Sequence, residues 1–131
     1  MLKIDKAIRD GIIAHARKDA PIEACGYLAE REGTVVTRYP LTNADASAEH
    51  YSLKPEEQFT ALREMRAAGL KLRAVYHSHP ASPARPSEED ILLAHDPEIS
   101  YVICSLLPGQ ETIKAFRIRG ALVTPEDVEV I

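Results

Sequence analysis

Cysteine is scarce in this chain. Its 131 residues include only two, Cys25 and Cys104, and neither belongs to a CxxC motif. A disulfide framework and a zinc knuckle built from cysteines are therefore both disfavoured. The two cysteines stand in apolar surroundings, and free cysteine is among the most frequently buried residue types, so we expect both in the core.

Long apolar runs and dense basic segments are lacking as well. No uninterrupted apolar run approaches the roughly 20 residues that cross a bilayer, and the amino terminus does not resemble a signal peptide. The formal net charge is −4, and no Lys/Arg block or basic aromatic face is available for a phosphate backbone. We therefore expect a soluble cytoplasmic protein that binds neither membrane nor nucleic acid.

In other respects the amino-acid composition is typical of a globular protein. A hydrophobic content of 45% supports one core, and 131 residues is the length of one domain. No repeat, low-complexity tract or linker divides the sequence. We expect a single domain over residues 1–131.

Hydrophobic periodicity and turn residues predict an alternation of helices and strands. The fold class expected from this order is mixed α/β, with a largely antiparallel sheet flanked by helices. The segment 42–49 is polar and reads as a loop. Helices are predicted at 4–18, 55–68 and 87–95, and strands at 24–29, 34–41, 70–79, 99–106 and 111–118, with an extended tail at 122–131.

Three good metal ligands occur within fourteen residues. His77 and His79 are two positions apart on a predicted strand, so both side chains project from one face. Three prolines in the following loop restrict the chain and reduce the entropy lost when Asp90 is brought to the same point. Two imidazoles and one carboxylate leave a tetrahedral zinc ion with an open position, as in catalytic sites.

Simpler explanations exist for the same residues. Ser87 with an acid three positions later is typical of a helix N-cap and capping box, and two histidines at a strand end can be purely structural. We interpret the remaining histidines, His15, His50 and His95, as structural, with His95 in the last turn of its helix.

Two other metal chemistries use similar ligands. Two histidines and a carboxylate form the facial triad of non-haem iron oxygenases, and an HxH pair opens the metal motif of cupins. The iron triad usually pairs a histidine with an acid at two-residue spacing and takes its second histidine from far downstream. Cupins need many more strands than this chain holds. Both are therefore disfavoured.

Residues 77–90 read as H-x-H-P, six residues, S, two residues and D, and this pattern resembles the signature of the JAMM or MPN+ family of zinc metalloproteases. The similarity extends in both directions. Residues 21–28 resemble the segment that supplies the glutamate of that family, and residues 101–106 resemble the strand behind its site. Every active-site position of the family is matched between about residues 21 and 106.

The resemblance implies a role for each matched residue. His77, His79 and Asp90 would be zinc ligands. Glu23 would be the general acid/base and Ser87 a donor to the oxyanion. Composition cannot select Glu23 from 20 acidic residues, although a carboxylate at the start of an apolar strand is costly to desolvate unless it has a partner or a task. The implied fold is a curved mixed sheet between helices.

The resemblance also implies a reaction. Family members cut peptide or isopeptide bonds after the C-terminal glycines of ubiquitin or ubiquitin-like proteins, whose extended tails can pair with a sheet edge. We therefore expect a zinc-dependent peptidase or isopeptidase that acts after the Gly-Gly of a ubiquitin-like or sulfur-carrier protein. Only about four residues separate the third predicted helix from the next strand, which indicates a compact, prokaryotic-type member. A zinc hydrolase of small amides and a metal-free scaffold are the alternatives.

Overall fold

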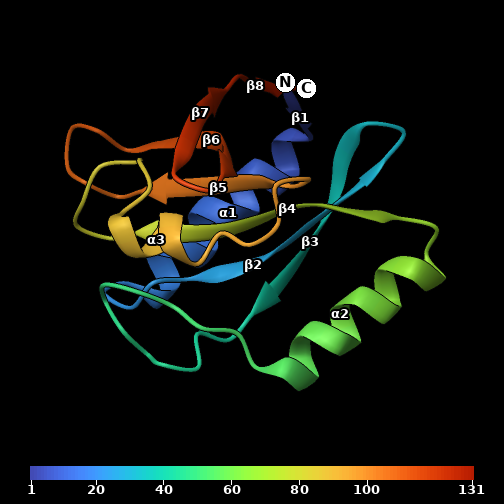
Figure 1. Cartoon of the computed structure of the whole chain (residues 1–131), viewed down its shortest axis with the longest axis horizontal. Coiled ribbons are helices and arrows are strands. Elements are labelled where there is room, and N and C mark those ends of the chain that lie inside the picture. Colours follow the sequence, from blue (N-terminus) through green and yellow to red (C-terminus); the bar gives the residue numbers. More distant parts are fainter.

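An eight-stranded mixed sheet runs through the computed structural model, which describes residues 1–131 (Figure 1). Its lateral order is β7-β6-β5-β4-β2-β3-β1-β8, with four antiparallel and three parallel pairings. The predicted mixed α/β fold is thus confirmed. The strands are β1 (Leu2–Ile4), β2 (Cys25–Arg31), β3 (Thr34–Leu41), β4 (Lys71–His79), β5 (Ser100–Ser105), β6 (Thr112–Arg119), β7 (Leu122–Glu126) and β8 (Val128–Val130).

Three helices flank this sheet, namely α1 (Lys6–Asp19), α2 (Pro55–Ala67) and α3 (Glu88–Leu92). Figure 1 shows α1 behind the central strands and α3 in front of them. None of the helices is long and apolar enough to span a bilayer.

Alternation along β4 divides the core into two layers. Tyr76 belongs to the buried cluster that includes α1 residues, whereas Val75 belongs to the cluster that includes α2 residues. Successive strand residues face opposite sides of a sheet, so His77 and His79 continue the face of Val75. The predicted metal ligands therefore lie on the side of the sheet that α2 and α3 cover. Cys25 and Cys104 are buried and unpaired, as predicted.

Close contact between β2 and β4 depends on a glycine. A Cβ atom at Gly26 would lie 2.4 Å from the Tyr76 ring and 2.6 Å from the main-chain oxygen of Tyr39. Glycine is therefore required at this position for the backbone and the ring to approach each other.

The third helix is shorter than predicted. The periodicity extends it to His95, but α3 ends at Leu92 and His95 lies beyond it. Leu92 and Leu93 are exposed, and only the partly buried Ile91 and Ala94 pack against the core in this region. The connection from α3 to β5 covers residues 93–99 and is longer than the four residues expected.

Both ends of the chain form strands that were not predicted. Ile4, expected to open the first helix, belongs to β1, and α1 begins at Lys6. The predicted extended tail is divided into β7 and β8. Strand β1 pairs in parallel with β3 and with β8, which places the two termini side by side (Figure 1). These pairings join distant residues, so a local pattern could not predict them.

A buried acid anchors the C-terminal strands to the sheet. The Glu126 carboxylate accepts hydrogen bonds from Arg73 at 2.9 Å, from Arg117 at 3.3 Å and from the Ser100 hydroxyl. Burial by itself would raise the pKa of Glu126, but the hydrogen bonds and positive charges outweigh it and lower the pKa to about 2. Glu126 therefore stays ionised at neutral pH and fixes the end of β7.

Candidate metal centre

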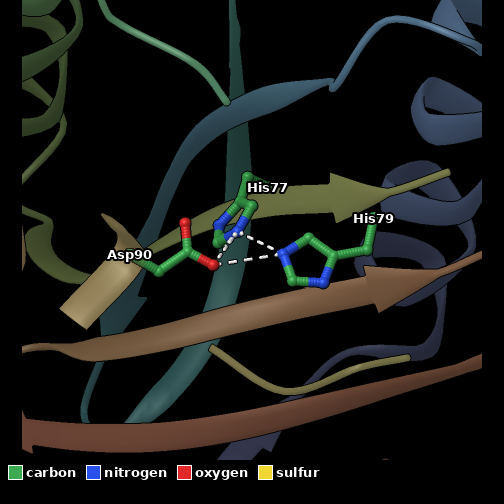
Figure 2. Close-up of side chains that lie close together, drawn as sticks. All are labelled: His77, His79 and Asp90. Atoms are coloured by element: carbon green, nitrogen blue, oxygen red, sulfur yellow. Dashed lines mark hydrogen bonds and ion pairs between the residues drawn. The ribbon is translucent and has the colours of Figure 1, made fainter. Parts of the chain in front are cut away.

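The end of β4 and the first turn of α3 bring three ligand atoms together (Figure 2). The His77 Nε2, His79 Nε2 and Asp90 Oδ2 atoms form a triangle whose three sides are each 3.1 Å. Both histidines are buried, at 2% and 5% exposure, and Asp90 is partly buried. The three residues with metal-ligand spacing in the sequence are thus neighbours in space.

The proline-rich loop that joins β4 to α3 is anchored at several points. The His79 Nδ1 atom lies 2.8 Å from the main-chain oxygen of Pro83, and the Ser105 hydroxyl donates to the oxygen of Ser82 at 2.7 Å. The Leu106 amide also donates to the oxygen of His79. These contacts orient the His79 ring and hold the loop against β5.

Ser87 and Asp90 form the capping box that the sequence predicted. The Asp90 amide donates to the Ser87 Oγ atom at 3.0 Å, and the Ser87 amide donates to Asp90 Oδ2 at 2.9 Å. The carboxylate oxygen that faces the histidines is therefore oriented by the helix cap. The Ser87 hydroxyl accepts in this bond, so its own proton remains free to be donated.

The donor set fits a metal ion. Tetrahedral zinc with bonds of about 2.0 to 2.2 Å requires ligand atoms roughly 3.3 to 3.5 Å apart, close to the sides of this triangle. Two imidazole nitrogens 3.1 Å apart in a buried site, both facing one carboxylate oxygen, are also the arrangement expected of groups that share a cation. The structure thus contains a His-His-Asp group that could hold a metal.

Burial and hydrogen bonding shift the pKa values of these groups in different directions. Burial lowers the pKa of His77, and the neighbouring Asp90 opposes this only in part. Burial also acts to lower the pKa of His79, but hydrogen bonds to Asp90 and Pro83 outweigh it and raise the pKa. Burial would raise the pKa of Asp90, yet its bonds with both imidazoles hold it well below the usual range. Asp90 is therefore ionised and available as a ligand.

Glu23 is close enough to the triangle for the charges of His79 and Asp90 to act on its carboxyl group. Its side chain is 3% exposed, and its Oε1 atom is buried without a hydrogen-bond partner. Burial raises the pKa of Glu23 to about 8, while His79 acts to lower it and Asp90 to raise it. A carboxyl group whose pKa is near neutrality is suited to accept and return a proton.

The main chain at Glu23 is fixed by a residue that the sequence did not reveal. Asn43, in the loop after β3, donates from its side chain to the oxygen of Glu23 at 3.1 Å and to that of His50 at 3.0 Å. The Glu23 amide donates to the oxygen of Ser47. Asn43 stood in a segment predicted only as a polar loop, and nothing in the local pattern distinguishes it.

Ser78 supports the same part of the site from the other face of β4. Its buried hydroxyl accepts a hydrogen bond from the Ala24 amide at 2.8 Å. This bond fixes the chain next to Glu23 to the strand that carries His77 and His79. In the sequence, only the position of Ser78 between the two histidines indicated a role at this site.

A cavity of about 370 Å³ adjoins the triangle at Asp90. Its wall combines tyrosine rings with aliphatic side chains, so it offers apolar area with a few polar groups. His50 and His95, interpreted from the sequence as structural, also line it. The other lining residues include Tyr27, Tyr51, Leu53, Leu93 and Tyr101.

Sequence comparison finds a family match over most of the chain. Residues 5–119 match the family described as prokaryotic homologs of the JAB domain. A relative from Mycobacterium tuberculosis, named CysO-cysteine peptidase, is 38% identical over 134 residues, which cover 100% of this chain and 92% of the relative. A relative from Thermus thermophilus, named probable TtuB-protein conjugate cleaving protease, is 34% identical and covers 99% of this chain and 80% of its own.

Comparison with solved structures agrees with this match. A solution structure from Desulfitobacterium hafniense shares 43% sequence identity, with a TM-score of 0.91 over 100% of this chain and 93% of that one. A JAB1/MPN domain protein from Archaeoglobus fulgidus has a TM-score of 0.70 at 20% identity and covers 99% of this chain and 97% of that one. The second likeness bears on the fold alone.

Proposed function

This chain belongs to the family of prokaryotic homologues of the JAB domain, also called JAMM or MPN, and we propose that it is a zinc-dependent peptidase. Its substrate would be a sulfur-carrier or ubiquitin-like protein, cut at the amide bond after a C-terminal Gly-Gly. The observation that carries the proposal is the His77, His79 and Asp90 triangle beside the buried carboxyl of Glu23. Residues 1–131 would act as one catalytic domain.

His77, His79 and Asp90 would hold the zinc ion. When bound, zinc supplies a Lewis acid that polarises the scissile carbonyl and makes a water molecule more acidic. Glu23 accepts a proton from the attacking water, because its carboxylate lies in the same charge environment and burial increases its basicity. It then returns the proton to the departing amine.

Ser87 would stabilise the negative charge that develops on the substrate. Its hydroxyl proton is not used in the helix cap, where the oxygen accepts from the Asp90 amide. A donor held at a fixed helix end can be aimed at an oxyanion without reorganisation during the reaction. Ser87 therefore combines a structural bond with a catalytic one.

The substrate class is supported by the relatives. One is named for a conjugate of CysO with cysteine and another for conjugates of TtuB with proteins. Both match essentially the whole of this chain. We infer that the bond cut here joins the C-terminal glycine of a small carrier protein to an amino acid or to another protein.

The direct test uses a carrier protein that ends in Gly-Gly followed by one cysteine. Mass spectrometry of the carrier after incubation is expected to show loss of that residue, and a chelator should prevent the loss until zinc is added back. Glu23→Gln is the matched inactive control. Cleavage of small amides without cleavage of the carrier, or cleavage that a chelator does not affect, would contradict the proposal.

A further inference from the structure

The two histidines of the triangle are held in different ways. The Nδ1 atom of His79 lies 2.8 Å from the oxygen of Pro83, a contact that fixes the orientation of its ring. The Nδ1 atom of His77 is buried and has no hydrogen-bond partner. A histidine that binds a metal usually donates its other N–H to an acceptor, which sets both the tautomer and the ring orientation. His77 lacks this support.

An aromatic ring lies against His77 instead. Tyr51 is stacked on the imidazole, with ring centroids 4.8 Å apart and an angle of 29° between the planes. Such stacking restricts the plane of each ring. The Tyr51 hydroxyl makes no hydrogen bond within the protein, so the ring face is its specific contact at this site.

The segment that carries Tyr51 is itself well anchored. The Asn43 side chain accepts from the Ser52 amide at 3.3 Å and donates to the oxygen of His50 at 3.0 Å. An isolated β-bridge also joins Asn43 to Leu53. Hydrogen bonds to both neighbours of Tyr51 therefore fix the position from which its ring reaches His77.

We propose that Tyr51 is the positioning residue for His77. Rotation about the Cβ–Cγ bond of a histidine is only weakly restricted, and a change in the plane of the ring would move Nε2 away from the corner of the triangle. The stacked ring of Tyr51 restricts the plane of the imidazole and so supplies part of the orientation that a hydrogen bond to Nδ1 would give. The inference rests on the proposed function, because it assigns Tyr51 to the metal site of that peptidase.

Metal affinity tests this role without any substrate. Competition with a chromophoric chelator gives the zinc dissociation constants of wild type, Tyr51→Phe and Tyr51→Leu. Phenylalanine retains the stacked ring, so Tyr51→Phe is expected to bind zinc within about threefold of wild type. Tyr51→Leu should bind roughly tenfold to a hundredfold more weakly, the range found when the supporting partner of a metal ligand is lost.

Tyr101→Leu is the matched control. Tyr101 lines the same cavity and is buried, but it does not stack on either histidine. Its replacement removes comparable packing and should leave zinc affinity within about threefold. Equal affinities of Tyr51→Leu and wild type would overturn the proposal, as would Tyr51→Phe binding as weakly as Tyr51→Leu.

Two further measurements keep the test decisive. If Tyr51→Leu does not fold, Tyr51→Met fills the same space with a flexible side chain and should show the same loss of affinity. The visible spectrum of the cobalt-substituted protein should change in the leucine or methionine variant and be restored in Tyr51→Phe. Wild type that binds zinc but leaves the carrier intact would contradict the proposed function alone.

Discussion

Glu23→Gln should stabilise the metal-free protein and remove nearly all turnover of the zinc-loaded protein. Burial raises the pKa of the Glu23 carboxyl from 4.5 to about 8, so between these values the folded protein holds a proton that the unfolded chain has released. Stability contributed by the protonated group is complete below pH 4.5 and declines as pH rises toward 8. The decline amounts to roughly 1.4 kcal/mol per pH unit. Glutamine does not titrate and escapes this loss.

The magnitude follows from the position of the side chain. With 3% exposure, Glu23 is too deeply buried for solvent to screen the effect substantially. From pH 4.5 to 7, the free energy of unfolding of Glu23→Gln should therefore rise relative to wild type by about 3 kcal/mol. Bound zinc would favour the charged carboxylate, so the difference should become smaller when the metal is present.

Urea unfolding in the presence of a chelator, at several values between pH 5 and pH 8, measures this difference. Wild type and Glu23→Gln are also loaded with zinc without chelator or urea. Glu23→Gln should then retain stoichiometric metal yet lose about 10²- to 10⁴-fold in turnover. A difference in stability that does not change with pH would show that Glu23 is ionised in the folded protein. An active Glu23→Gln enzyme would remove Glu23 from the mechanism.

Three other substitutions test separate parts of the account. Ser87→Ala should lose on the order of 10²-fold in rate, because the oxyanion donor is removed, and about 1 kcal/mol of stability, because the helix cap is removed. Ser87→Thr keeps the hydroxyl group and should restore both. Unchanged turnover of Ser87→Ala would exclude Ser87 as an oxyanion donor. Gly26→Ala should lower the free energy of unfolding by about 1 to 3 kcal/mol, because the new Cβ atom would meet a ring and a main-chain oxygen. Gly11→Ala is the control, since its Cβ atom would meet only the Arg38 side chain. Equal effects of the two substitutions would refute the argument. Glu126→Gln should lower the free energy of unfolding by about 2 kcal/mol at pH 7. The Glu126 carboxylate of the wild type contributes stability above pH 4.5 that disappears as pH falls through about 2. A loss that is the same at pH 3 and pH 7 would contradict this.

The centre of the chain was predictable from its sequence because its elements are set by local patterns. The strand that ends at His79 is a buried run, and its period of two places both histidines on one face. The capping box at Ser87 and Asp90 is likewise a short-range signal. Proximity of Asp90 to the histidines could be anticipated because only one short loop intervenes.

Features that depend on distant contacts were not predictable in this way. Strands β1 and β8 exist because they pair with each other, and β7 is fixed by Glu126 bonding to Arg73 on another strand. Asn43 and Tyr51 belong to a loop without periodicity, and their contacts reach Glu23 and His77 only through the folded chain. Helix α3 ends at Leu92, where Leu92 and Leu93 are exposed and the core contacts are limited to Ile91 and Ala94.

The location of the metal tests the central claim most directly. Diffraction data from crystals grown with zinc, recorded on both sides of the zinc absorption edge, would place the ion without reference to activity. The account predicts one strong peak about 2.0 to 2.2 Å from His77 Nε2, His79 Nε2 and Asp90 Oδ2, and no peak there in Asp90→Asn. Zinc bound elsewhere, with the triangle empty in an active enzyme, would contradict it.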